Sequence, residues 1–512
     1  MAAGSGALLA AIAPPRNLHG LHWVTFVPLL VALRPGEART SARLAFVAGF
    51  AAQATIFWWI VATVVRFASL PKPVAWLLLA VFAAVFALPY AAAFGIAPWL
   101  RERLGVAWVF ALPAWLVAVE RLSPQLFPYY QGVSQYRVAW VFQLASVLGV
   151  MGVSYLVVMV NCAVAEVILR LRERRRLPWP AFGAVALIFA VNLAFGAART
   201  ARVDALLATA RTIKVALLQT TAMHRTPWTK LTRQVMPEHP DLVVWPESAI
   251  SQDPTEPATR TLLSTLAREG HFDLFLGGGT VDRPGTKERR EYNSAYHFDR
   301  NGEIAGRYDK MVLLPFGEYM PLSDTFPSLK RISGPSDLVA GKDPVVLRAD
   351  GYTFTGPICY EAILDDQMRK LSGADLIVNV TNDGWFGDTA APHQHAMLAA
   401  VQAVQIGRPL LRVAYTGTSF VVEPHGRILY ETKPFTEVAE VRPLRLASVD
   451  TLYGQGGWLF PWACVAAAIG AILKARRATP KVAPAAPPPT ATHPPAPLVA
   501  PPAPSPPSPL VD

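Results

Sequence analysis

Three side chains in the second half of the sequence have the chemistry needed for acyl transfer: the thiol of Cys359, the carboxylate of Glu247 and the amine of Lys310. Cys359 is the only one of the three cysteines that lies outside a long apolar run. Taken singly, each residue also has an ordinary structural explanation, as a packed core cysteine, a salt-bridged or helix-capping carboxylate, and a solvated lysine. Their arrangement is more informative, because each lies at or near the end of a strand-like segment.

The three groups are chemically complementary. A carboxylate that follows a buried apolar strand is partly desolvated, which raises its pKa and suits Glu247 to proton transfer. A lysine beside a thiol favours the thiolate, and its ammonium can stabilise the oxyanion that forms when a carbonyl is attacked. Glu247 can take the proton of Cys359 and return it to the leaving group.

The segment 212–450 is expected to position these groups, because it alternates strand-like and helix-like stretches. Strands are predicted at 213–219, 241–245, 273–276, 292–298, 354–358, 374–380 and 410–423, and helices at 259–269, 363–371 and 395–406. This alternation predicts an α/β fold with a large sheet covered by helices, in which strand ends project into a shared crevice. The run 277–279 is Gly-Gly-Gly without a downstream Gly-Lys-Ser/Thr, so we interpret it as tight packing.

The remainder of the chain has the composition of a membrane protein. Of its 512 residues, 52% are hydrophobic and 16% are charged. A spanning helix needs roughly 20 mostly apolar residues, and the candidates are 44–65, 74–98, 104–121, 142–169, 178–197 and 457–474, with shorter runs at 20–34 and 5–14. We expect about eight spans, of which the first is short. The platform at 1–198 holds the first seven, and the last helix occupies 457–475.

Basic residues predict the orientation of these spans, because loops rich in lysine and arginine stay in the cytoplasm. Alternate loops carry such residues: Arg34, Arg39 and Arg43; Arg101 and Arg103; Arg170, Arg172 and Arg174 to Arg176; Lys474, Arg476 and Arg477. The segment between spans seven and eight is therefore expected outside the cytoplasm. The net charge of +11 has this topological origin, and no basic stripe interleaved with aromatics indicates nucleic-acid binding.

The spans themselves indicate a platform and not a transporter, because transporters carry ionisable groups near the bilayer centre. Glu120, Arg121 and Glu166 all lie near span ends. Cys162 and Cys464 lie inside spans, so no disulfide framework is expected. The segment 479–512 is rich in proline and alanine and is predicted to be a disordered cytoplasmic tail.

Several short motifs resemble the nitrilase, or carbon–nitrogen hydrolase, superfamily. They are Trp-Pro-Glu-Ser around Glu247, Lys310 followed by Pro-Phe-Gly-Glu ending at Glu318, and Cys359-Tyr360-Glu361. With the membrane platform, the chain to about residue 475 resembles the apolipoprotein N-acyltransferase family. The supporting matches are Asn-Asp-Gly-Trp-Phe-Gly at 382–387, Pro-His-Gln-His at 392–395 and Gly-Arg-Pro-Leu-Leu-Arg at 407–412.

The resemblance implies an αββα sandwich at 212–450 and a role for each matching residue. Glu247 is implied to be the general base, Lys310 the oxyanion stabiliser and Cys359 the nucleophile. The supporting residues implied by the same motifs are Glu318, Tyr360 and Glu361. Residues implied to contact the substrate are Trp228, Trp385 and Arg121.

The resemblance further implies the reaction and its partners. An acyl chain passes from a membrane phospholipid, through a thioester on Cys359, to the α-amino group of the N-terminal diacylglyceryl-cysteine of apolipoproteins. This is the last step of bacterial lipoprotein maturation, carried out by a monomer in the inner membrane with its catalytic domain in the periplasm. No cofactor or metal is implied, and the spacing of His393 and His395 is not followed by a third ligand.

Departures from the family pattern lie outside the three reactive residues. They are the segment Tyr-Thr-Gly-Thr-Ser at 415–419, Gly384, the short first span and the proline-rich tail. Two alternatives remain at this stage. One is a membrane-anchored amidase or nitrile hydrolase that uses the same three residues on a small soluble substrate. The other is a scaffold or transporter with an inactive nitrilase-like domain.

Overall fold

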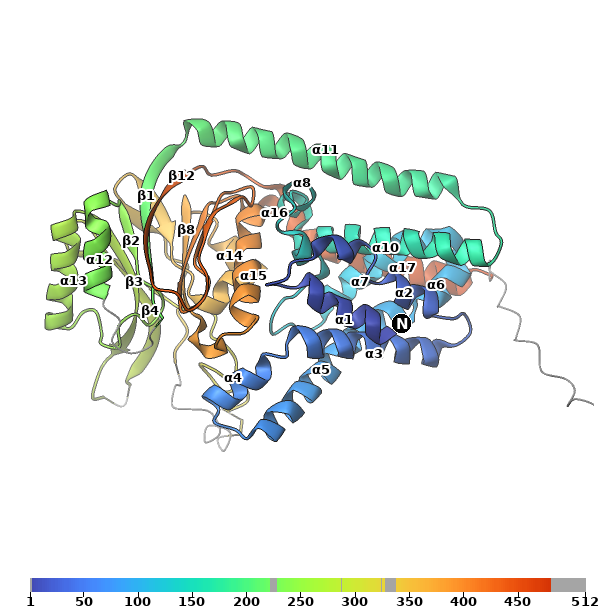
Figure 1. Ribbon diagram of the computed structural model, residues 1–512, viewed down its shortest axis with the longest axis horizontal. Coiled ribbons are helices and arrows are strands. Elements are labelled where there is room, and N and C mark those ends of the chain that lie inside the picture. Colours follow the sequence, from blue (N-terminus) through green and yellow to red (C-terminus); the bar gives the residue numbers. More distant parts are fainter. Residues whose placement is uncertain (1, 222–227, 287, 324, 327–337, 480–512) are drawn as a thin grey trace, which may run out of the picture.

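The structure is a computed structural model that describes residues 2–221, 228–286, 288–323, 325–326 and 338–479. Helices occupy one side of the molecule and two β-sheets the other (Figure 1). The helical side contains α1 (Ala2–Ile12), α2 (Val27–Ala32), α3 (Ala38–Ile56), α4 (Ile60–Phe67), α5 (Lys72–Gly95), α6 (Ala97–Leu104), α7 (Trp108–Leu122), α8 (Ala139–Phe142), α9 (Ala145–Leu148), α10 (Val150–Arg172), α11 (Trp179–Thr209), α16 (Leu452–Gln455) and α17 (Phe460–Arg477). Single 3-10 turns join several of them: η1 (His19–Trp23), η2 (Gly105–Ala107), η3 (Gln131–Gln135) and η8 (Gly457–Leu459).

Within the described residues, four helical stretches are long and apolar enough to cross a membrane: Lys72–Leu122, Val150–Arg172, Trp179–Thr209 and Gly457–Arg477. The pair α3 and α4, bent by 50° at a short break, would be a fifth. The first stretch contains α5 and α7, which pack against each other. A straight helix of its 51 residues would reach about 77 Å, more than twice the ~30 Å of the hydrocarbon core. We therefore infer that this stretch crosses and returns.

The multi-span helical domain expected from the sequence is confirmed, with four or five sufficiently long and apolar helical stretches among the described residues. Because one of these stretches crosses and returns, the number of stretches is smaller than the number of spans, and the expected count of about eight stays a prediction. The expected spans at 5–14 and 20–34 correspond to the shorter apolar helices Ala2–Ile12 and His19–Ala32. The expected span at 142–169 begins later, at Val150. Gly149 adopts a φ of 72° there, and this left-handed residue separates α9 from α10.

The sheet side contains two six-stranded sheets. The first has the order β12-β1-β2-β3-β4-β5 and the second β11-β10-β9-β8-β7-β6. Their strands are β1 (Arg211–Gln219), β2 (Leu242–Val244), β3 (Asp273–Asp282), β4 (Arg290–Phe298), β5 (Ile304–Asp309), β6 (Leu347–Ala349), β7 (Tyr352–Thr355), β8 (Leu376–Asn382), β9 (Leu410–Tyr415), β10 (Phe420–Val422), β11 (Ile428–Glu431) and β12 (Val438–Leu446). In each sheet three parallel strands, β1-β2-β3 and β7-β8-β9, are flanked by antiparallel ones.

The sheets pack face to face and are covered by helices, which confirms the expected αββα sandwich. Alternate residues of the first sheet face opposite sides, so that Val215 and Phe275 join the core between the sheets, and Ala216 and Leu274 face outward. The rings of Phe275 and Phe354, from different sheets, lie 5.2 Å apart. The first sheet is covered by α12 (Trp228–Val235) and α13 (Pro257–Gly270), and the second by α14 (Asp365–Lys370) and α15 (Ala391–Ile406).

Helix α15 joins the two sides of the molecule. All of its residues except His393 are buried, because it lies between the second sheet and the helical domain (Figure 1). Its glutamines bind the helical side: Trp59 Nε1 donates to Gln394 Oε1 at 3.0 Å, and the backbone N–H of Val150 donates to Gln405 Oε1 at 2.8 Å. These buried bonds fix the sheets relative to the membrane helices.

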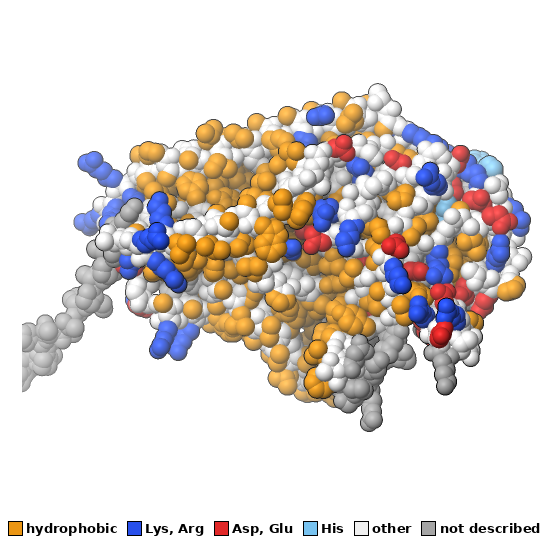
Figure 2. Space-filling view, turned by 180° about the vertical axis from the view of Figure 1, so that it is seen from behind, with side chains coloured by type: hydrophobic (Ala, Val, Ile, Leu, Met, Phe, Trp, Pro, Cys, Tyr) orange, Lys and Arg blue, Asp and Glu red, His pale blue; other side chains and the backbone are white. Residues whose placement is uncertain are grey.

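The polarity of the surface agrees with a membrane position. On the face seen in Figure 2, hydrophobic side chains cover much of the helical domain, basic side chains gather at its far end, and the sheet domain carries charges of both signs. The expected tail at 479–512 lies outside the described residues, apart from Thr479.

We predict that Glu166 is the main ionic support of the helical domain. Its carboxylate is 1% exposed and bonds Arg101 Nε at 2.6 Å, Arg170 Nε at 2.5 Å and Trp108 Nε1 at 2.9 Å. Glu166→Ala leaves Arg101 buried without this partner and should lower the free energy of unfolding by about 3 kcal/mol or more. The exposed Glu37 provides the control, and Glu37→Ala should change it by less than about 0.5 kcal/mol. Thermal unfolding in detergent compares the two, and equal melting temperatures would contradict the prediction.

Candidate active site

The ends of three strands bring Glu247, Lys310 and Cys359 together between the two sheets. Glu247 follows β2 and Lys310 follows β5, both in the first sheet, whereas Cys359 follows β7 in the second. The side chains are almost fully buried, with exposures of 4%, 1% and 7% for the residues. Lys310 Nζ lies 3.5 Å from Glu247 Oε1, and the Cys359 thiol is near enough to interact electrostatically with both. The grouping predicted from the sequence is therefore present.

Glu247 is held by its own backbone and by two hydrogen bonds. The loop after β2 is bonded to β3 at Gly277, whose N–H donates to Pro246 O and whose carbonyl accepts from Ala249 N. A Cβ on Gly277 would lie 2.5 Å from the Cα of Glu247, so this glycine permits a close approach of the two chains. Asn382 N donates to Oε2 and Asn293 Nδ2 to Oε1, both at 2.7 Å.

Glu318 and Asn293 complete the surroundings of Lys310. Lys310 Nζ donates to Glu318 Oε1 at 2.8 Å, and the other carboxylate oxygen accepts from Leu314 N at 2.7 Å. Asn293 Nδ2 also donates to Glu318 Oε1, at 2.9 Å. One amide therefore bridges the two carboxylates that flank the ammonium. Sequence reasoning missed Asn293, because a lone asparagine inside a strand carries no signal in one sequence.

Cys359 lies on a sharp turn that Glu361 stabilises. Its φ of 52° is left-handed, which is uncommon for a residue other than glycine and costs roughly 1–3 kcal/mol. It opens η6 (Cys359–Ile363). The buried Glu361 carboxylate accepts from the backbone N–H groups of Ile358, Met311 and Val312 at 2.7–3.0 Å. It thereby bonds the turn of the nucleophile to the segment that follows Lys310.

Tyr360 links the same turn to the helical domain. Its hydroxyl donates to the carbonyl of Leu126 at 2.7 Å, and its ring lies edge-on to Phe127 at 6.3 Å. Phe127 in turn contacts Trp59, at 5.3 Å between ring centroids. Aromatic side chains therefore continue from the turn of Cys359 into the helical domain.

A buried ionic network that includes His395 supports the turn of Cys359. Arg412, which is 0% exposed, donates to Asp383 Oδ2 at 2.9 Å and to Asn379 Oδ1 at 2.7 Å. Asn379 Nδ2 donates to the carbonyl of Pro357, two residues before Cys359, at 2.9 Å. His395 Nδ1 lies 2.7 Å from Asp383 Oδ1. Although burial acts to raise the pKa of Asp383, Arg412 and His395 hold it below its usual value.

The described residues include one group of histidine and carboxylate side chains close enough for a metal ion: Asp204, Glu423 and His425. Arg427 Nη1 lies 2.9 Å from Asp204 Oδ1 and 3.5 Å from Glu423 Oε2. A guanidinium therefore already compensates these carboxylates, and we interpret the group as an ion-pair cluster that joins α11 to the loop between β10 and β11.

The charges of the site favour a neutral thiol that can pass its proton to Glu247. Burial and the charge of Glu247 raise the pKa of Cys359, against the effect of Lys310. Burial also raises the pKa of Glu247, although Lys310 acts in the opposite direction. For Lys310, burial favours the neutral amine, but Glu247, Cys359 and Glu318 outweigh it and raise the pKa. Transfer of the thiol proton to Glu247 leaves the net charge of the cluster unchanged, whereas release of that proton to solvent would not.

The residues expected to contact substrate lie in three different places. Trp228 is 5% exposed and stacks on Trp245 at 5.6 Å in the outer core of the first sheet, so it does not join the cluster. Trp385 lies in η7 (Asp383–Phe386), a turn that follows Asn382 and contacts α4. Arg121 lies over the ring of Trp462 at 5.0 Å and 3.7 Å from Asp366, beside a cavity of about 350 Å³.

Comparisons with known proteins cover both sides of the molecule. Residues 214–450 match the carbon–nitrogen hydrolase family, and residues 5–163 match the apolipoprotein N-acyltransferase N-terminal domain. An apolipoprotein N-acyltransferase of Geobacter metallireducens is 32% identical over 504 residues, covering 93% of this chain and 95% of that protein. One of Brucella melitensis is 31% identical over 519 residues, covering 92% and 95%.

Among solved structures, an amidase from Nesterenkonia sp. AN1 aligns with 48% of this chain and 95% of its own, at 22% identity and a TM-score of 0.35. The sequence matches extend over the helical and the sheet domains together, and on that basis the chain belongs to the apolipoprotein N-acyltransferase family.

Proposed function

We propose that this protein is an N-acyltransferase that takes an acyl chain from a membrane phospholipid and holds it as a thioester on Cys359. It then passes the chain to the α-amino group of the diacylglyceryl-cysteine at the N-terminus of apolipoproteins. The observation that carries the proposal is the buried cluster of a thiol, an ammonium and a carboxylate. The turn that holds Cys359 in this cluster is bonded to the membrane domain through Tyr360. The names of the relatives support the acceptor.

In the first half-reaction Glu247 accepts the thiol proton of Cys359, and the thiolate attacks the ester carbonyl of the phospholipid. The ammonium of Lys310 stabilises the oxyanion. The carbon–oxygen bond breaks, Glu247 returns the proton to the departing alkoxide, and a lysophospholipid leaves behind a thioester.

In the second half-reaction the α-amine of the lipoprotein attacks the thioester. Glu247 accepts the amine proton as the carbon–nitrogen bond forms. The intermediate collapses, an amide leaves, and the thiolate of Cys359 recovers the proton. The covalent intermediate implies ping-pong kinetics.

The membrane domain gives this chemistry its substrates. Extraction of an acyl chain into water costs about 0.8 kcal/mol for each exposed CH₂ group, and a site against the bilayer avoids that cost. The aromatic side chains between the Cys359 turn and the helices also help to exclude water, which would hydrolyse the thioester. We place the sheets in the periplasm of a bacterial inner membrane, because the basic end of the helical domain lies far from them (Figure 2). The protein is proposed to act as a monomer.

The decisive experiment is the formation of the acyl-enzyme. Purified protein mixed with labelled phospholipid should gain one acyl group on the Cys359 peptide, as seen by mass spectrometry. Cys359→Ser and Cys359→Ala should form no thioester and lose at least about 1000-fold in acyl transfer to a diacylglyceryl peptide. Cys162→Ala, a change in the buried middle of α10, is the matched control and should keep the adduct. Normal transfer by Cys359→Ala would refute the mechanism, and turnover of small amides without acyl transfer would favour the amidase alternative.

The pH dependence should show an acid limb set by Glu247. The base must be ionised to act, and its pKa is raised, so kcat/KM falls as the pH drops through a value above the usual carboxyl pKa. We expect no fall of kcat/KM on the alkaline side up to about pH 9, because the pKa of Lys310 is raised and the amine keeps its proton. Glu247→Gln should abolish this limb together with most of the activity. A limb at the ordinary carboxyl pKa would contradict the assignment.

Asn293 is predicted to be a positioning residue. Asn293→Ala removes the amide that bridges Glu247 and Glu318 and should lower kcat by about 10- to 100-fold, since each lost bond joined a charged group. KM should change little, and the acid limb of the pH profile should shift with the new surroundings of Glu247. Asn301→Ala, in an exposed turn, is the control. If the pH profile of the Asn293→Ala enzyme is unchanged, the prediction is wrong and the role of Asn293 is only structural.

A further inference from the structure

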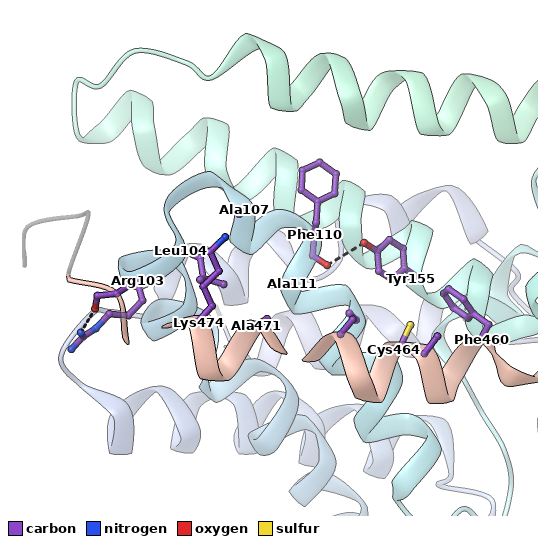
Figure 3. A pocket seen from close by; sticks show the side chains of 14 residues that line it. Arg103, Leu104, Ala107, Phe110, Ala111, Tyr155, Phe460, Cys464, Ala471 and Lys474 are labelled. Atoms are coloured by element: carbon purple, nitrogen blue, oxygen red, sulfur yellow. Dashed lines mark hydrogen bonds between the residues drawn. The ribbon is translucent and has the colours of Figure 1, made fainter. Parts of the chain in front are cut away.

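A second cavity lies in the helical domain, in a region that the proposed reaction does not use. It has a volume of about 550 Å³ and runs between α7, α10 and α17 (Figure 3). Small side chains line much of it: Ala107, Ala111, Ala114, Ala463, Ala467, Ala471 and Ala478. α7 and α17 belong to stretches that are long and apolar enough to cross the membrane, so a groove between them lies at the depth of the lipid chains.

The two ends of the groove differ in chemistry (Figure 3). Phe460, Cys464 and Tyr155 line one end, and Arg103 and Lys474 line the other. The described residues that line it include no acidic side chain. The groove is therefore apolar along its length and cationic at a single end.

The described residues that line this end offer no carboxylate to its two basic side chains. Arg103 Nη1 donates to the carbonyl of Ala478 at 2.6 Å, and its buried Nε has no hydrogen-bond partner among the described residues. The neighbouring Arg101 differs, because it is paired with both Glu166 and Glu173. Lys474 is exposed at the same end. A guanidinium and an ammonium at the same end of the groove, with no carboxylate among the described lining residues, are suitable partners for a phosphate group.

The length of the groove matches one lipid chain. From Phe460 to Lys474 it follows about 14 residues of α17, or roughly 21 Å at the helical rise. The hydrocarbon of one leaflet is about 15 Å deep, half of the ~30 Å core. A single acyl chain and the phosphate above it can therefore lie along the groove.

We propose that this groove binds an anionic phospholipid, with one acyl chain along α17 and its phosphate at Arg103 and Lys474. The lipid belongs to the leaflet at the basic end of the helical domain, far from the sheets (Figures 1 and 2). The site is distinct from the proposed donor site, and the inference does not depend on the proposed chemistry. Its occupant packs α17 against α7 and α10.

The test uses the full chain in phosphatidylcholine nanodiscs that contain a small amount of phosphatidylglycerol with a photoreactive diazirine near the end of an acyl chain. After illumination, mass spectrometry should find adducts on the groove-lining segments of α7 and α17. Unlabelled phosphatidylglycerol should compete for these positions and unlabelled phosphatidylcholine should not. Equal competition by the two lipids would overturn the proposal.

Two pairs of variants test the two ends of the lipid. The double variant Arg103→Gln and Lys474→Gln should raise the concentration of unlabelled phosphatidylglycerol that halves the labelling by about 30-fold. This corresponds to about 2 kcal/mol for the loss of two basic side chains. The control variant, Arg476→Gln with Arg477→Gln, removes two exposed charges at the same end that do not line the groove. It should change the concentration of unlabelled phosphatidylglycerol that halves the labelling by no more than about threefold. Equal effects of the two pairs would reject phosphate recognition at Arg103 and Lys474.

Ala467→Phe should fill the groove and remove the adducts on α17. Ala466→Phe places the same ring on the adjacent residue, which does not line the groove, and should keep them. Identical adducts in these two variants would overturn the assignment of the chain to the groove. Gel filtration and acyl-transfer activity confirm that each variant is folded. The single variant Lys474→Gln, at an exposed position, keeps the test decisive if Arg103 is needed for folding and should weaken competition about fivefold.

Discussion

Lys310 carries a positive charge into a place where its residue is 1% exposed, and the architecture of the sheet domain makes that burial tolerable. A buried ammonium is stable only when opposite charges and hydrogen bonds replace its lost water. Glu247 and Glu318 provide the charges, and Asn293 holds both carboxylates in place. Burial and the charge of Glu247 raise the pKa of the Cys359 thiol, although Lys310 acts in the opposite direction. The thiolate therefore forms most readily when its proton stays within the cluster, on Glu247.

The packing of the two sheets against each other brings the buried charges and the thiol together. Glu247 and Lys310 come from one sheet and Cys359 from the other, so neither sheet contains the complete set. Glu361 spans the gap by accepting from backbone groups on both sides. Its presence in the Cys-Tyr-Glu motif is therefore explained by geometry, as is that of Tyr360, which ties the turn to Leu126 in the membrane domain.

Local patterns in the sequence were enough to predict that Glu247, Lys310 and Cys359 come together, and to predict the αββα layers and a helical membrane domain, because each leaves a short-range signal. Asn293 and Arg412 left none, since their partners lie far away in sequence and the roles arise only when strands pair. The start of one span was placed too early, because an apolar run does not reveal where a helix breaks, as at Gly149. The stacking of Trp228 on Trp245 could not be predicted either, because the two residues meet only when α12 packs on the first sheet; a contact of Trp228 with substrate stays a prediction.

The edge of the first sheet has a consequence for biosynthesis. Strand β1 pairs on one side with β12, in a register that runs from Arg211 with Leu446 to Gln219 with Val438. Roughly 220 residues separate the paired segments, which corresponds to roughly 10 to 45 s of ordinary chain synthesis. Throughout that interval β1 follows directly from α11 with one open edge, and open edges invite pairing with other chains. The first residues of β1 include the exposed Arg211 and Lys214, which point to opposite faces of the strand. Their charges oppose such pairing until the last strand arrives.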